Sequence, residues 1–499
     1  MFEPAIAPSG TLLGLLQRGR GDGTLHALAA PRPEALAALD RCVLADPRHD
    51  WRVENRSLYY ARLYLDLHGG LEAVEAHLFA PEDHLDTEEH RTGLALAVLG
   101  HLASYGRHDA LLLLRRYAAT GANWAWALDE LALRDDDAGL RSLAEPVLAR
   151  FPQDAAGDAE LGRTVRDAFE PRPWRLWAED QRDAVGARVR AAQEQGSFDR
   201  WQRQLRPTGP RPGWSVRAVL DWAQEGYERG ADLAGPAARC LAAVAGPEDR
   251  PELLAAGRDG APGARGAVLH HLAAGRDPAV LDLVEAAADG VHPLDAAAAA
   301  DASGQGEPYG DVPGAVDRDA LHVARAAVTA YLRMCGDDAV ARARAWVHRP
   351  DPLGAAAGEL LAARGEDRDA QLVLGALRTA IRAAGPDAPA LGALVDGAGR
   401  LGIACAAPVL RHVYRETASS QLRGRTARAL AATDPCFASG FAVECLWDCE
   451  ETTREIAAQH AETADVRVAE RLRRLAADPA EEVEVQTAVR NRIGPDLQV

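Results

Sequence analysis

A short segment with two tryptophans and an aspartate offers the most specific chemistry in the sequence. It reads Asn123-Trp124-Ala125-Trp126-Ala127-Leu128-Asp129. Indole rings stack on flat or positively charged groups, and a carboxylate stabilises positive charge that develops beside it. Both tryptophans precede Asp129 by about one helical turn, so a helix here would present these groups together.

This pattern resembles the active helix of HEAT-like DNA glycosylases, in which tryptophan faces stack on a cationic damaged base. The resemblance implies a catalytic role for Asp129, with Trp124 and Trp126 holding the base. The family places its tryptophan four residues before the aspartate, whereas the spacings here are five and three. The lysines of the family's basic groove are also absent. The alternative is that both tryptophans pack between helices and Asp129 faces solvent, which the acidity of the chain favours.

A second group of aromatic residues lies in a stretch that is rich in arginine. Residues 163–217 contain twelve arginines against seven acidic residues, although the chain as a whole is acidic. Arginines can contact phosphates and tryptophans can stack on bases, so this stretch could also bind nucleic acid. The candidate binding residues are Trp174, Arg175, Trp177 and Trp201.

Histidines and acidic residues gather further towards the N-terminus, and such side chains can hold zinc or iron. The group consists of His77, Asp83, His84, Asp86, Glu88, Glu89, His90, His101 and His108. Helical-repeat hydroxylases that bind two irons use His-Glu dipeptides, and this chain contains none. Acidic residues are also the ordinary preference at a helix N-terminus, so we predict no metal site.

The cysteines offer a weaker metal hypothesis. Cys445 and Cys449 are four residues apart, which predicts one helix face, with Cys436 and Cys405 as further ligands. Zinc sites usually contain two closely spaced cysteine pairs, and only one pair is present. We therefore predict that these cysteines are small apolar residues of a helical core.

The sequence argues against several enzyme classes. All 56 basic residues are arginine, and no lysine is present. P-loop phosphate binding, Schiff-base chemistry and kinase-type ATP handling all use a lysine. No Gly-x-Ser-x-Gly nucleophile motif occurs, and no Gly-x-Gly-x-x-Gly follows a strand. We predict no cofactor.

The elements that position these residues are indicated by an internal repeat near the C-terminus. Three segments align, beginning at Leu422, Thr453 and Val483, with starts 31 and 30 residues apart. The alignment places three alanines in register, namely Ala427, Ala458 and Ala488. A small residue at a fixed position on a helix lets a neighbouring helix approach closely. A period of this length is typical of stacked helix pairs.

The dipeptide Asp-Pro occurs five times, at Asp46, Asp277, Asp351, Asp434 and Asp478. An aspartate can accept hydrogen bonds at a helix N-terminus, and proline is tolerated at the first helical position. We therefore predict that a helix begins at each dipeptide. Asp478-Pro479 followed by Val483 and Ala488 resembles the HEAT-like helix pairs of bacterial α-solenoids. The family usually places an arginine after the valine, as at Arg423 and Arg454, but position 484 is glutamate.

These observations predict an all-α protein: an α-solenoid of stacked antiparallel helix pairs, HEAT-like or armadillo-like. Alanine and leucine dominate while aromatic residues make up 5%, which favours close-packed helices over β-sheet. The expected domains are an N-terminal helical array (1–155), an irregular connection rich in proline, arginine and tryptophan (156–215), central repeats (216–300), a Gly/Pro loop (301–315) and C-terminal repeats (316–499).

Function follows less directly from the sequence. A repeat array suits binding, so we expect a non-enzymatic scaffold that binds another protein through its concave face. The alternative is a HEAT-like DNA glycosylase or another repeat enzyme acting on nucleic acid. A net charge of −18 argues against nucleic acid for the chain as a whole. No apolar run reaches the length of a membrane-spanning helix, so we expect a cytoplasmic protein with no membrane partner.

Overall fold

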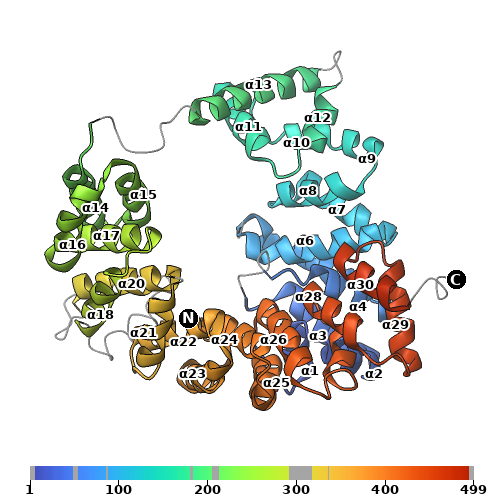
Figure 1. The fold of residues 1–499 in the computed structure, drawn as a ribbon. Coiled ribbons are helices and arrows are strands. Elements are labelled where there is room, and N and C mark those ends of the chain that lie inside the picture. Colours follow the sequence, from blue (N-terminus) through green and yellow to red (C-terminus); the bar gives the residue numbers. More distant parts are fainter. Residues whose placement is uncertain are drawn as a thin grey trace. The chain divides into compact units, whose positions relative to one another are not determined.

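The computed structural model confirms the all-α class. It describes residues 6–48, 54–85, 88–179, 184–204, 213–290, 317–334 and 336–493, with side chains described only as far as 194 in the fourth of these ranges. No strand occurs in any of these ranges. Successive helices pack on one another, and the chain divides into two compact units. One unit combines residues 1–206 with 413–499, and the other contains residues 207–412 (Figure 1).

The first unit begins with a helical array, which comprises the described residues up to 204. Its helices are α1 (Leu12–Arg18), α2 (Gly21–Ala29), α3 (Arg32–Leu44), α4 (Ser57–Asp66), α5 (Glu72–Leu78), α6 (Glu89–Ser104), α7 (His108–Thr120), α8 (Trp124–Arg134), α9 (Asp137–Ser142), α10 (Ala144–Leu148), α11 (Ala155–Asp167), α12 (Arg172–Ala178) and α13 (Ala184–Gln204).

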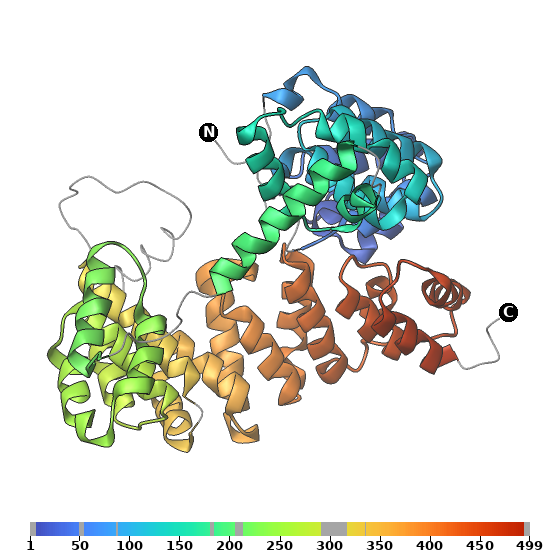
Figure 2. The same cartoon turned by 90° about the horizontal axis from the view of Figure 1, so that it is seen from above.

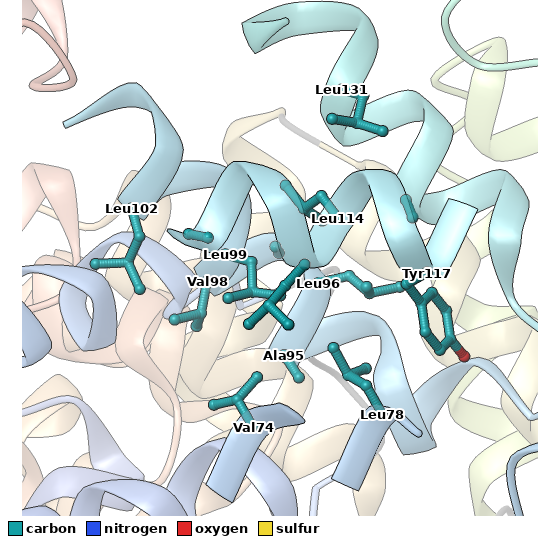
Figure 3. Close-up of a cluster of buried hydrophobic side chains, with 14 of the residues drawn as sticks. Val74, Leu78, Ala95, Leu96, Val98, Leu99, Leu102, Leu114, Tyr117 and Leu131 are labelled. Carbon is teal, nitrogen blue, oxygen red and sulfur yellow. The ribbon is translucent and has the colours of Figure 1, made fainter. Parts of the chain in front are cut away.

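Helix α6 forms the centre of the array because its sequence is apolar almost all round. Nearly every residue from Thr92 to Leu102 is buried, and the helix packs on α3, α4, α7 and α8. A helix without a polar face must be surrounded by others. Figure 3 shows Leu96 and Leu99 of α6 together with Leu78 and Leu114 from neighbouring helices.

The second unit is also built from sequentially packed helices. They are α14 (Val216–Glu228), α15 (Ala234–Val244), α16 (Arg250–Asp259), α17 (Pro262–Ala274), α18 (Val280–Asp289), α20 (Arg318–Arg333), α21 (Asp337–Trp346), α22 (Pro352–Arg364), α23 (Ala370–Ala384) and α24 (Leu391–Arg400). Helix α17 packs on α14, α15, α16 and α20, and α22 packs on α21, α23 and α24. Helix α25 (Ala407–Glu416) contains the boundary between the units.

The remaining helices of the first unit contain the predicted repeat. They are α26 (Ser420–Thr433), α27 (Phe441–Cys445), α28 (Glu451–His460), α29 (Val466–Ala477) and α30 (Val483–Ile493), and Figure 2 shows them following one another in a row. The three aligned segments lie on α26, α28 and α30, and α28 packs on both of the others. Ala427, Ala458 and Ala488 are all buried, which fits their expected role in close helix packing.

Two arginines of the repeat form buried ion pairs with the loop of the next repeat. Arg423 contacts Asp448 at 3.0 Å, and Arg454 contacts Glu481 at 2.6 Å. All four side chains are almost completely buried. Glu484, which aligns with these arginines, is exposed. The aligned arginines therefore fix each helix against the segment that follows it.

The prediction that every Asp-Pro begins a helix is wrong for four of the five dipeptides. Asp351 caps α22 as expected, with its side chain accepting from the Gly354 backbone N–H at 3.0 Å. In the other four, the aspartate accepts from the backbone N–H two residues on, the pairs being Asp46 and Arg48, Asp277 and Ala279, Asp434 and Cys436, and Asp478 and Ala480, at 2.9–3.1 Å. This local turn satisfies the carboxylate without a helix.

The irregular connection expected at 156–215 is also wrong, because most of α11 and all of α12 and α13 lie there. Pro173 lies in the first turn of α12, where its missing N–H donor is not needed. The Gly/Pro loop expected at 301–315 lies outside the described residues. The boundaries of the other expected domains stay predictions.

The row of repeat helices packs against the N-terminal array along a surface that we call the seam (Figure 1). On the array side it contains Gly19, Gly21, Glu54, Arg56, Arg62 and Tyr105, and on the repeat side 418–420, Glu444, Cys449, Asp478 and Glu481. A β-carbon at Gly21 would overlap the carbonyl oxygen of Glu444. The two backbones thus meet directly, and only glycine fits there.

One seam carboxylate predicts a dependence of stability on pH. Burial, helped by the charge of Asp22, raises the pKa of Glu444 to about 7, and one of its oxygens is buried without a hydrogen-bond partner. The unfolded chain ionises near pH 4.3, so the folded state loses stability as pH rises from there to about 7. We expect Glu444→Gln to stabilise the protein by about 2 kcal/mol at pH 8 and to have almost no effect at pH 4. Thermal melts at both pH values check this, and equal shifts would contradict it.

Candidate functional site

Three of the tryptophans that the sequence singles out come together between α8 and α12. The Trp124 ring meets the Trp174 ring edge to face, with centroids 6.4 Å apart, and Trp174 meets Trp177 in the same way at 5.0 Å. Phe151 approaches Trp124 from another side at 5.9 Å. Edge-to-face contacts suit the charge distribution of aromatic rings, so this cluster is a stable support.

An open cavity of about 400 Å³ lies over this cluster, and we call it the aromatic pocket. Its lining residues are Trp124, Ala125, Trp126, Leu128, Asp129, Thr164, Asp167, Ala168, Phe169 and Trp174. The structure therefore brings together the two tryptophans and the aspartate of the α8 segment, and it adds Trp174 from the arginine-rich stretch. An apolar cavity with a few polar groups is the usual form of a ligand site.

Asp129 positions one edge of the pocket. Its Oδ1 accepts a hydrogen bond from the backbone N–H of Glu170 at 3.1 Å. This contact ties α8 to the segment between α11 and α12, where Phe169 lies. The other pocket carboxylate, Asp167, pairs with Arg166 at 2.6 Å. Both carboxylates thus interact with groups of the protein itself.

Phe169 is the most exposed of the large apolar pocket residues, and sequence reasoning missed it. Its side chain is 79% exposed, although large aromatic residues are usually buried. The signal available in the sequence was a phenylalanine two residues before Pro171, between two helices. Exposed apolar groups of this kind mark binding surfaces when they adjoin a cavity.

The other predicted binding residues are divided between the interior and the surface. Trp174 and Trp177 are only 2% and 3% exposed, and the Trp177 indole N–H donates to the Leu140 carbonyl at 2.8 Å. Arg175 is exposed. The side chain of Trp201 lies outside the described residues. A role of these four residues in binding stays a prediction.

An arginine also contacts the aromatic cluster. The Arg150 guanidinium is 5.5 Å from the centre of the Trp124 ring, and its Nη2 donates to the Ala119 carbonyl at 2.8 Å. Burial lowers the pKa of Arg150. The contact with a cation holds the Trp124 ring in place below the pocket.

Two members of the histidine and acid group, Asp83 and His77, have structural partners. Asp83 is buried, and it accepts hydrogen bonds from Arg91, from the Tyr117 hydroxyl and from the Ala122 backbone N–H at 2.5, 2.6 and 2.7 Å. His77 Nε2 lies 2.8 Å from the carbonyl oxygen of Arg91. Asp86 lies outside the described residues. Within the described ranges, no three histidine, cysteine or acidic side chains are placed to share a metal ion.

The cysteines do not form the predicted helix face. Helix α27 ends at Cys445, and Cys449 lies in the following loop because the chain turns there. Cys445 is in the core as expected, donating to the Tyr414 hydroxyl at 3.1 Å, and Cys449 accepts from Arg423 at 3.3 Å. Cys405 and Cys436 are exposed, so the prediction of a core position is wrong for these two.

A larger open cavity of about 710 Å³ lies beside the aromatic cluster. Its lining includes Phe151, Pro152, Asp158 and Arg188. Phe151 lines this cavity and also contacts Trp124, which lines the aromatic pocket. The two cavities therefore share one aromatic wall.

The chain matches no family model, and it shows no significant similarity to a curated protein or to a solved structure. The functional argument therefore depends on the pocket itself. No helix in the described part of the chain is long and apolar enough to cross a bilayer.

Proposed function

We propose that this chain is a HEAT-like helical-repeat scaffold that binds another protein, and that a side chain of the partner enters the aromatic pocket. The HEAT-like assignment is supported by helices repeated at 31 and 30 residues, with buried alanines in register and an arginine–acid pair between successive repeats. The binding role is supported by the pocket, which combines an apolar cavity with an exposed aromatic side chain.

The observation that carries this proposal is Phe169 at the edge of a cavity lined by three tryptophans. Tryptophan and tyrosine concentrate at the energetic centres of protein interfaces, because they exclude water from a large area at low entropic cost. The supporting cluster of Trp124, Trp174 and Phe151 is packed in advance, so little freedom is lost when a partner binds. A rigid aromatic pocket is therefore suited to a partner's apolar anchor.

We expect Trp126→Ala and Phe169→Ala each to weaken partner binding by at least about 2 kcal/mol, the loss typical of a central interface residue. The partner is first identified by purifying the tagged protein from its own host and analysing what elutes by mass spectrometry. Affinity for the purified partner is then measured by calorimetry for each variant.

Leu133→Ala is the matched control, because Leu133 is an apolar residue of the same helix, 59% exposed and outside the pocket. We expect it to bind like the unmodified protein. Equal binding by all three variants would place the partner elsewhere on the chain and remove the pocket from the proposal.

A second candidate function is a repeat enzyme that acts on nucleic acid. The observation in its favour is that Trp124, Trp126 and Asp129 line one pocket, as an aromatic base-binding site with a carboxylate requires. The net charge of −18 opposes it. Salt-sensitive DNA binding together with base release that Asp129→Asn abolishes would favour this candidate, and absence of DNA binding would exclude it.

A further inference from the structure

The three loops that precede α26, α28 and α30 are each bound by a residue of the N-terminal array. Where the first loop meets α26, Glu54 accepts from the Ser420 backbone N–H at 2.8 Å. In the second, the Cys449 backbone N–H donates to the Gly19 carbonyl at 2.8 Å. In the third, Arg62 contacts Asp478 at 2.7 Å and Glu481 at 3.1 Å. The array thus covers one loop of every repeat in the row.

The seam differs from the helix contacts on either side of it because its close contacts are mainly polar. The hydrophobic cluster that joins the helices of the array is formed by residues from Leu12 to Ala192. Of the hydrophobic side chains described in 413–493, Cys449 alone packs against that cluster. Apolar packing between the array and the described part of the repeats is therefore limited. The seam lies inside one compact unit, but its polar character resembles that of transient protein interfaces.

The acidic residues of the seam also have hydrogen-bond or ion-pair partners within their own part of the chain, the array or the repeats. Glu481 is paired with Arg454 of the repeat at 2.6 Å as well as with Arg62 of the array. Glu54 is paired with Arg56 of the array at 2.5 Å. Asp478 accepts from the Ala480 backbone N–H at 2.9 Å. Because an unpaired buried charge is the main cost of breaking an ion pair, these retained contacts make separation easier.

We propose that the seam is a charge-latched closure, which lets residues 413–493 leave the array as a folded piece and uncovers the three loops for a partner. While the seam is closed, Gly19, Glu54 and Arg62 occupy that surface. A partner that takes their place must supply the same groups, namely a carboxylate for the Ser420 backbone N–H and an arginine for Asp478 and Glu481. The seam and the aromatic pocket have no residue in common, so this surface is distinct from the pocket.

The test is hydrogen exchange of the full-length protein, measured by mass spectrometry, with and without Arg62→Ala. The reporters are peptides that contain the Ser420 and Cys449 amides, which donate across the seam. We expect their exchange to rise at least about tenfold in the variant, because the latch is weakened. Exchange in α6 of the array and in α28 of the repeats is expected to stay unchanged.

Arg107→Ala is the matched control, because it removes an ion pair of the same array that is more exposed and lies away from the seam. It is expected to leave both reporter peptides unchanged. Two results would overturn the proposal. Unchanged reporters in Arg62→Ala would show that the charges do not hold the seam. Faster exchange throughout α6 and α28 would show that the two pieces unfold as one.

Discussion

Arg423→Ala is expected to destabilise the first unit by about 3–5 kcal/mol, the cost of leaving a buried charge without its partner. Arg423 and Asp448 are both completely buried and are joined through two hydrogen bonds of 3.0 and 3.1 Å. Alanine removes the guanidinium and leaves the buried Asp448 carboxylate without its charged partner, although the Glu450 backbone N–H and the Tyr414 hydroxyl still donate to it. The measurement is the free energy of unfolding in urea, followed by circular dichroism.

Arg428→Ala provides the control for this prediction, since Arg428 is an exposed arginine of the same helix. We expect a change of less than about 0.5 kcal/mol, as for ordinary surface substitutions. The double variant Arg423→Met with Asp448→Leu removes both charges and is expected to recover most of the loss. If Arg423→Ala were as mild as Arg428→Ala, the ion pair would not stabilise the repeat.

Trp174→Ala is expected to cost about 3–5 kcal/mol, the range for removing a buried tryptophan. Trp174 is 2% exposed and contacts the rings of Trp124 and Trp177, so its removal leaves a cavity below the aromatic pocket. Thermal unfolding and the near-ultraviolet circular dichroism of the tryptophans measure the effect.

Trp126→Ala is the matched tryptophan variant, because Trp126 is only half-buried and lines the same pocket. Together the two variants are expected to distinguish a residue that stabilises the pocket from one that contacts the partner. Trp174→Ala lowers stability strongly, whereas Trp126→Ala lowers partner binding with a small loss of stability. A larger loss of stability for Trp126→Ala than for Trp174→Ala would reverse these roles.

The helical class was predictable because it depends on local periodicity. One position of the aligned helices is buried and is occupied by a small residue each time, namely Ala427, Ala458 and Ala488. Such a requirement makes alanine recur at a regular interval in the sequence. The Asp-Pro prediction failed because the same side chain can satisfy two geometries. An Asp-Pro whose aspartate caps a helix and one whose aspartate closes a short turn have the same sequence signature, and of the five only Asp351 caps a helix directly.

The candidate site was predictable in part. Trp124, Trp126 and Asp129 are close in sequence, so their meeting in one pocket follows from a helix at that position. The contributions of Phe169 and Arg150 depend on how α8, α10 and α12 pack. Neighbouring residues in the sequence do not indicate which helices pack together. The seam could not be predicted from the sequence for a related reason. Arg62 and Asp478 are far apart in a chain with 56 arginines and 74 acidic residues, so nothing marks them as partners.

The division of the first unit between both ends of the chain has a consequence for synthesis. The ribosome completes the array up to Arg206 and must then make the 206 residues of the second unit before 413–493 begins to emerge. At roughly 5–20 residues per second, the face of the nascent array that carries Glu54 and Arg62 waits uncovered for about 10–40 seconds. Because the contacts that this face later makes are mainly hydrogen bonds and ion pairs, its exposure carries a smaller risk of aggregation than exposure of an apolar face would.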